Sequence, residues 1–166
     1  MNVDYIIKIF RRLLLNKMPL RKTIVFESSP DFGCNTYPVF RYIEKAYPEY
    51  KIVWALSKKP KLTPDGVDYT IYYRPANTWE KIKSLYYLNT CSAMVSSNYF
   101  LRKHDERQIS LFLCHGSKTK RTKGIYEMGR NVDYIEVQSH FFDEIITYEY
   151  GCSKDQLVYL GYPRCD

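Results

Sequence analysis

Short apolar runs and longer amphipathic stretches alternate along this chain. The short runs are rich in β-branched and aromatic residues and therefore predict strands. They lie at residues 23–28, 51–56, 69–73, 93–97, 109–114, 134–138 and 157–160. The longer stretches carry apolar residues at helical spacing, and they lie at residues 35–46, 78–89 and 141–150. Strands that alternate with helices predict a parallel sheet covered on both faces, which is a Rossmann-like α/β domain.

Polar residues and one glycine mark the ends of the predicted helices. Asn35 and Asn77 stand at the starts of the first two helices, where an asparagine side chain commonly caps the first turn. Gly151 follows the third helix and is expected to end it.

The first residues carry a separate amphipathic pattern. One helical face of residues 4–17 is apolar and consists of Ile6, Ile7, Phe10, Leu13 and Leu14. The other side carries Lys8, Arg11 and Arg12. This pattern fits a helix packed on the domain and a basic helix lying in a membrane interface equally well. We therefore expect an amphipathic basic helix over residues 1–20, followed by the Rossmann-like domain over residues 21–166.

Composition and charge narrow the classes of partner. A chain of 166 residues suits one domain, and its net charge of +7 favours an anionic membrane surface, a phosphate-rich substrate or nucleic acid. A nucleic-acid-binding protein is the least expected, because the basic residues are dispersed and no reader motif is present. The five cysteines contain no CxxC pair, which favours a reduced cytosolic setting and no zinc site. No apolar stretch is long enough to span a bilayer.

The residues after the predicted fifth strand carry the strongest candidate chemistry. Ligands of open α/β sheets bind beyond the carboxyl ends of the strands, and His115 emerges there from an apolar run. A glycine, a hydroxyl residue and three cations follow it, namely Gly116, Ser117, Lys118, Lys120 and Arg121. The imidazole can accept a proton near neutral pH, and the cations and loop amides can hold phosphoryl oxygens. The alternative is a histidine satisfied by a backbone carbonyl and followed by a solvated basic loop.

Several short blocks occur together in a characteristic order. They are Phe26-Glu27-Ser28 with Cys34-Asn35, Ile52-Val53-Trp54, Tyr87-Leu88 through Ser96-Ser97-Asn98, His115-Gly116-Ser117 with Lys120, Val132-Asp133-Tyr134, Ser139-His140-Phe141-Phe142, and Leu160-Gly161-Tyr162-Pro163-Arg164 with Asp166. Their order resembles the CDP-glycerol glycerophosphotransferase family of teichoic acid synthesis from about residue 23 to the end of the chain. The chain departs from the family pattern at Cys114, Ser117, Lys118 and Cys165, which leaves the polyol and the acceptor open.

The resemblance implies a transferase that moves glycerol phosphate, or a related polyol phosphate, from a CDP-activated donor to a hydroxyl of a teichoic-acid-like or capsular polymer. It implies that His115 is the general base. It also implies that Gly116, Ser117, Lys118, Lys120, Arg121, Asn35 and Arg164 bind substrate or phosphate, with no metal and no cofactor. The implied fold is one half of a GT-B architecture, the N-terminal acceptor-side domain. The nucleotide-binding C-terminal domain has no counterpart here, so we expect a fragment or a truncated form that is inactive alone.

The implied partners are a CDP-glycerol or similar CDP-polyol donor, a polyol phosphate or lipid-linked acceptor, and an anionic membrane surface, but no nucleic acid. The implied location is peripheral, on the cytoplasmic face of a bacterial cell membrane. Two alternatives remain: a non-catalytic membrane-surface binding module, and a related cell-surface polysaccharide glycosyltransferase with a different donor.

Overall fold

A computed structural model describes residues 18–98, 101, 103–114, 129 and 131–165. The predicted helix over residues 1–20 lies almost wholly outside these residues. No helix in the described ranges combines the length and the apolar character needed to cross a membrane.

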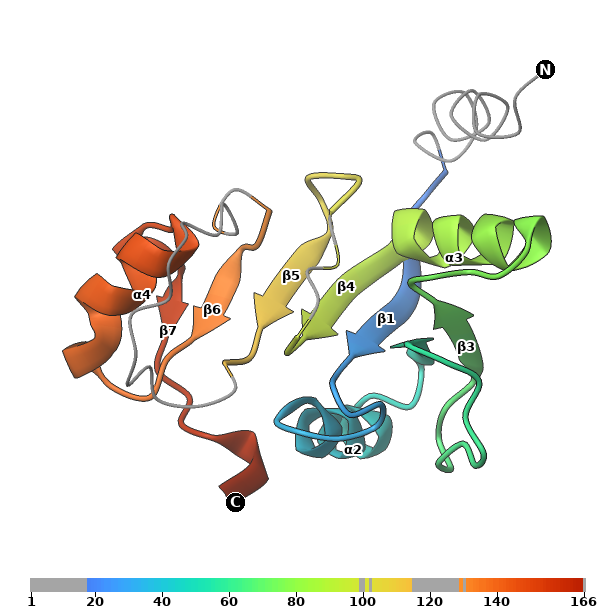
Figure 1. Cartoon of the computed structure of the whole chain (residues 1–166), viewed down its shortest axis with the longest axis horizontal. Coiled ribbons are helices and arrows are strands. Elements are labelled where there is room, and N and C mark those ends of the chain that lie inside the picture. The colour runs from blue at the N-terminus through green and yellow to red at the C-terminus, as the bar shows by residue number, and fades with distance from the viewer. Residues whose placement is uncertain (1–17, 99–100, 102, 115–128, 130, 166) are drawn as a thin grey trace.

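The core of the fold is a sheet of seven parallel strands in the order β3-β2-β1-β4-β5-β6-β7 (Figure 1). The strands are β1 (Arg21–Glu27), β2 (Lys51–Leu56), β3 (Tyr69–Tyr72), β4 (Cys91–Ser96), β5 (Ile109–Phe112), β6 (Tyr134–Glu136) and β7 (Leu157–Val158). The α-helices are α2 (Thr36–Ala46), α3 (Thr78–Thr90) and α4 (Asp143–Tyr150), and the 3₁₀ turns are η2 (His140–Phe142), η3 (Lys154–Gln156) and η4 (Pro163–Cys165). The predicted parallel Rossmann-like sheet is therefore confirmed.

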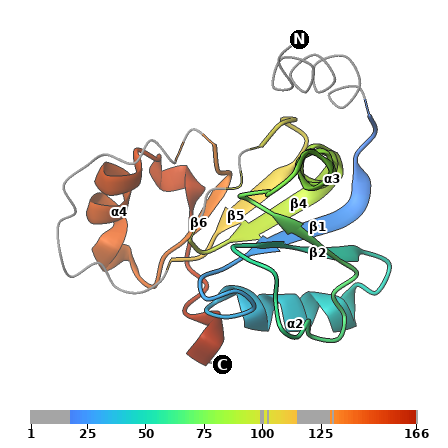
Figure 2. The ribbon, with the colours of Figure 1, turned by 45° about the vertical axis from the view of Figure 1, so that its right-hand side comes forward.

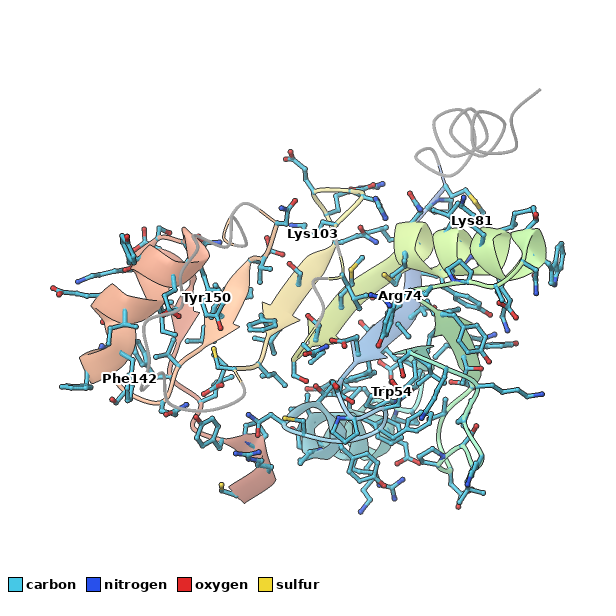
Figure 3. The ribbon with its side chains drawn as sticks, viewed as in Figure 1. Trp54, Arg74, Lys81, Lys103, Phe142 and Tyr150 are labelled. Atoms are coloured by element: carbon cyan, nitrogen blue, oxygen red, sulfur yellow. The ribbon has the colours of Figure 1, made fainter. Side chains whose placement is uncertain are left out.

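Alternate residues of the strands pack on opposite faces of the sheet, as the period of two requires. Phe26 and Trp54 pack in the cluster against α2, where both rings contact Phe40. Figure 3 labels Trp54 in this region. Val25 and Val53 point the other way, into the cluster against α3. Figure 2 shows the sheet held between α2 and α3, so both faces of its first half are covered.

The second half of the sheet has its own cluster. Phe112 of β5 and Ile135 of β6 pack with Ile146 and Tyr150 of α4. The chain then returns toward the first half, because η4 packs against α2 near the carboxyl terminus (Figure 1). The two halves are therefore joined through the sheet and through this closing turn.

The predicted fifth strand is shorter than expected, and the hydrogen bonds explain why. The backbone N–H of Leu113 still donates to Ser96 on β4 at 2.8 Å. The next N–H, that of Cys114, donates to the side chain of Glu136 at 3.1 Å. The regular ladder therefore ends before the residues that a pattern of apolar positions assigns to the strand.

Two of the three predicted helix ends are confirmed and one is wrong. Asn77 caps α3, since its side chain accepts from the backbone N–H of Glu80 at 2.9 Å. Gly151 ends α4 in the left-handed region with φ 60°. The cap predicted for Asn35 is wrong, because its side chain makes no capping bond to α2 and its amide donates elsewhere.

Candidate functional site

The order of the strands reverses between β1 and β4, which makes their carboxyl ends the topological switch point of the sheet. Open α/β sheets bind their ligands in the crevice outside this point. The arrowheads of β1, β5 and β6 all point toward the lower edge of the sheet in Figure 1. The candidate site is therefore this edge, called the carboxyl edge below.

A strained loop leaves β1 at the carboxyl edge. The hydroxyl of Ser28 donates to the Pro30 carbonyl at 2.8 Å and accepts from the Gly33 amide at 3.0 Å. Phe32 and Cys34 have φ of 58° and 56°, a conformation that costs a non-glycine residue about 1 kcal/mol. The surrounding contacts hold the loop in this shape, as is common at sites that approach a ligand closely.

Glu27 joins the two strands that flank the switch point. Its side chain is fully buried at the end of β1. Its Oε2 atom accepts from the backbone amides of Ser97 at 3.3 Å and Asn98 at 3.0 Å, both just beyond β4. A buried carboxylate that receives backbone amides is strongly held, so this side chain fixes the two turns relative to each other.

The backbone of Cys114 is held from two sides. Its N–H donates to Oε2 of Glu136 on β6 at 3.1 Å. Its carbonyl accepts from Nδ2 of Asn35, at the start of α2, at 2.6 Å. Glu136 and Asn35 are both fully buried. Side chains from two different elements therefore converge on the residue that directly precedes His115 in the chain.

Burial changes the acidity of Glu136. Removal of the carboxyl from water raises the pKa of Glu136 from 4.5 to about 7, and the hydrogen bond from the Cys114 amide opposes this rise only in part. A carboxyl with such a pKa is divided between its charged and neutral forms near neutral pH. Strongly raised carboxyl pKa values are concentrated at functional sites.

A second group of polar side chains lies beyond β6 and β7. Nδ1 of His140 lies 3.3 Å from Oδ2 of Asp143, and the hydroxyl of Tyr159 donates to Oδ1 of the same carboxylate at 2.9 Å. The rings of His140 and Tyr159 lie 3.9 Å apart between centroids. Burial, followed by the Asp143 carboxylate, raises the pKa of Tyr159. His140 is the most exposed member, with 80% of its side chain accessible.

The structure brings part of the predicted site together. Asn35 lies against the residue preceding His115, although its amide binds backbone and is fully buried. Arg164 lies on the exposed surface of η4, with its guanidinium over the ring of Tyr162 at 5.4 Å, and η4 packs against α2. The remaining predicted residues fall outside the described ranges, namely His115, Gly116, Ser117, Lys118, Lys120 and Arg121. Their roles stay predictions.

Two carboxylates at this edge were not predicted from the sequence. Glu27 ends the apolar run of β1, and Glu136 interrupts that of β6. An acid that ends or interrupts an otherwise buried strand is the signal that could have found both, because an unpartnered charge is too costly to bury.

A surface hollow of about 530 Å³ lies away from this site. It is lined by Lys103, Asp133 and their neighbours, at the amino ends of β5 and β6. Figure 3 places Lys103 at the upper edge of the sheet, opposite the carboxyl edge. Two of its charged groups, Lys103 and Asp133, pair with each other at 2.7 Å, so the hollow is a weaker candidate than the switch point.

Comparisons with known proteins identify relatives of this chain. The teichoic acid poly(glycerol phosphate) polymerase of Bacillus subtilis (strain 168) is 24% identical over 178 residues, which cover 93% of this chain and 23% of that protein. The chain thus spans about a quarter of the length of this curated relative.

The fold of this chain is similar to that of the wall teichoic acid polymerase TagF. A structure of a TagF variant with CDPG has a TM-score of 0.74 at 20% identity, over 93% of this chain and 42% of the other. Another TagF structure has a TM-score of 0.71 at 19% identity, over 98% and 46%.

The family comparison covers nearly the whole chain. The sequence profile described as CDP-Glycerol:Poly(glycerophosphate) glycerophosphotransferase matches residues 9–166. That match contains the strained loop, both buried carboxylates and the residues that follow β5. The chain therefore belongs to the CDP-glycerol:poly(glycerophosphate) glycerophosphotransferase family.

Proposed function

We propose that this chain is the acceptor-side half of a transferase that moves glycerol phosphate from CDP-glycerol to a hydroxyl of a polyol phosphate chain or a lipid-linked primer. The observation that carries the proposal is the convergence of Asn35 and Glu136 on Cys114 at the carboxyl edge. This edge is where an α/β sheet presents its reactive groups, and the family membership supplies the class of reaction.

In the proposed reaction, His115 acts as the general base. It accepts the proton of the acceptor hydroxyl while the acceptor oxygen forms a bond to the glycerol-linked phosphorus of the donor. The bond from that phosphorus to the bridging oxygen breaks, and CMP leaves. Such a base contributes about 10²–10⁴-fold in rate. Gly116 leaves room for the substrate to come close.

Charge neutralisation contributes the other part of the catalysis. Phosphoryl transfer depends mainly on positioning and on cations that stabilise the equatorial oxygens. Lys118, Lys120 and Arg121 are the proposed cations, with the hydroxyl of Ser117 assisting. Arg164 is a further candidate, since η4 returns the chain to α2.

We further propose that a second Rossmann-like domain supplies the contacts to the cytidine nucleotide, which gives a GT-B arrangement with the site between two domains. The length of the curated relative supports this division, because the chain matches 23% of it. The acceptor is proposed to be held at a membrane, with the basic amphipathic segment of residues 1–20 attaching the protein to an anionic surface.

A transfer assay tests the proposed function. The product of the complete gene is incubated with CDP-[¹⁴C]glycerol and a glycerol phosphate primer, and polymer-bound label and CMP are measured. Variant His115→Ala should lower kcat about 10²–10⁴-fold with an unchanged melting temperature. Variant His140→Ala is the matched control, because it removes the described exposed imidazole at the same edge.

Each outcome of this assay is informative. Equal loss in both histidine variants, or a normal rate per folded His115→Ala molecule, would remove His115 from the mechanism. Transfer from a nucleotide sugar, with none from CDP-glycerol, would favour a polysaccharide glycosyltransferase. Liposome binding without turnover of any donor would favour a non-catalytic membrane module.

A further inference from the structure

The peptide units on both sides of Cys114 are fixed by side chains. The N–H that donates to Glu136 belongs to the unit joining Leu113 to Cys114. The carbonyl that accepts from Asn35 belongs to the unit joining Cys114 to His115. Because each unit is planar, the two hydrogen bonds together restrain the backbone dihedrals of Cys114. They therefore restrain the direction in which the chain leaves this residue.

Holding Cys114 with two buried polar side chains has a cost in folding free energy. Asn35 and Glu136 are both 0% exposed, and one oxygen of each side chain, Oδ1 and Oε1, has no hydrogen-bond partner among the residues that the structure describes. A buried polar atom without a partner costs about 1–3 kcal/mol. A backbone carbonyl of a longer β6 could have accepted from the Cys114 amide without leaving a side-chain oxygen buried. Burying two polar side chains that each have one unpartnered oxygen therefore supports a role in fixing the backbone geometry at Cys114.

The opposite end of the same strand provides a comparison. Oδ2 of Asp133, at the start of β6, accepts from the backbone amide of Ser110 at 2.8 Å. The same two strands are thus joined by a carboxylate-to-amide bond at each end. The Asp133 bond lies next to the ion pair with Lys103, at the opposite end of the two strands from Cys114. Its loss therefore reports what such a bond contributes to stability alone.

We propose that Asn35 and Glu136 are positioning residues that hold the backbone leading into His115 in its working geometry. The proposal rests on the proposed function in that His115 is taken to be the base. Neither side chain needs to touch the substrate, because both act through the peptide units of Cys114. A misplacement of about 1 Å at a reacting group can cost about 10²-fold in rate, which is the effect expected when one of the two bonds is lost.

The first test separates positioning from folding. In the product of the complete gene, Glu136→Ala and Asn35→Ala should each lower kcat about 10–10²-fold per folded molecule, while the KM for CDP-glycerol changes less than about twofold, since uniform binding is unaffected. Glu136→Gln keeps an oxygen acceptor for the Cys114 amide and should restore most of kcat. Asp133→Ala, the matched control at the far end of β5, should lower the melting temperature with a normal kcat per folded molecule. Equal effects of Glu136→Ala and Asp133→Ala on kcat would overturn the proposal.

The second test uses a double-mutant cycle. If the two side chains act through His115, then Glu136→Ala should have little further effect in a His115→Ala background, because residues that act as a unit are non-additive. An undiminished effect in that background would overturn the proposal.

Hydrogen exchange distinguishes failure of this inference from failure of the proposed function. Amide exchange at Cys114, followed by NMR in the 166-residue chain, should accelerate at least about tenfold in Glu136→Ala, because that amide loses its acceptor. Unchanged exchange would show that the bond does not hold the backbone and would overturn the inference by itself. Accelerated exchange together with a normal kcat for His115→Ala would instead refute the role of His115 and, with it, positioning toward that base.

Discussion

The carboxylate of Glu27 accepts a 3.0 Å hydrogen bond from the backbone amide of Asn98, which ties the end of β1 to the turn after β4. The same oxygen also receives the amide of Ser97 at 3.3 Å. These two strands flank the switch point of the sheet, so one buried acid sets the spacing of the turns between which a ligand would bind.

The first prediction concerns this carboxylate. Glu27→Ala should destabilise the domain by about 2–4 kcal/mol, because the amides of Ser97 and Asn98 lose their side-chain acceptor and a cavity forms. Urea unfolding followed by circular dichroism measures the change. Glu49→Ala is the matched control, since Glu49 makes only a 3.8 Å surface ion pair with Lys22 and should cost less than about 1 kcal/mol. A similar loss in both variants would contradict the role given to Glu27.

The second prediction concerns the pH dependence of stability. The folded protein holds the Glu136 proton more tightly than the unfolded chain, because its pKa rises from 4.5 to about 7. The unfolded state therefore binds fewer protons, and this group makes the free energy of unfolding fall as the pH increases from about 4.5 to about 7. Its contribution is most favourable below this window and is lost above it.

Variant Glu136→Gln isolates that contribution. The difference in melting temperature between wild type and variant should change across pH 4.5–7.5. The melting temperature of the wild type should fall relative to that of the variant as the pH rises. A difference that stays constant over this range would mean that the carboxyl does not titrate there.

The third prediction concerns the chain by itself. The purified 166-residue chain should show no measurable transfer from CDP-glycerol, because a transition state held from two domains loses its positioning when one side is missing. Release of CMP and incorporation of labelled glycerol into polymer are the measurements. Sustained turnover by the isolated chain would refute the two-domain proposal.

The fourth prediction concerns the N-terminal segment. Deletion of residues 1–18 should abolish co-sedimentation with anionic liposomes, because each Lys or Arg near such a surface contributes about 1 kcal/mol. Neutral liposomes provide the control for charge. Unchanged sedimentation after the deletion, or unfolding of the domain, would favour a helix packed on the core.

The hydrophobic periodicity correctly predicted features that depend on residues close together in the chain. The predicted range of β2 matches the strand, and the predicted start of α3 is confirmed by its Asn77 cap. Asn35 carries the same local signal, but its side chain bonds to Cys114, 79 residues away. A local pattern holds no information about that partner. Glu27 and Glu136 stand out locally as acids in buried strands, but the backbone amides that they bind, just beyond β4 and β5, cannot be read from a local pattern.

The central place of β1 in the sheet has a consequence for the order of folding during synthesis. β1 pairs with β2, which leaves the ribosome soon after it, and with β4, which follows only after α3. A nascent chain can therefore close β1, β2 and β3 against α2 while the other side of β1 still lacks its partner. An unpaired edge of this kind, with the apolar Val25 and Phe26, is a site for intermolecular pairing. Arrival of β4 covers that edge, so a pause in translation before β4 prolongs the exposure of an unpaired, apolar strand.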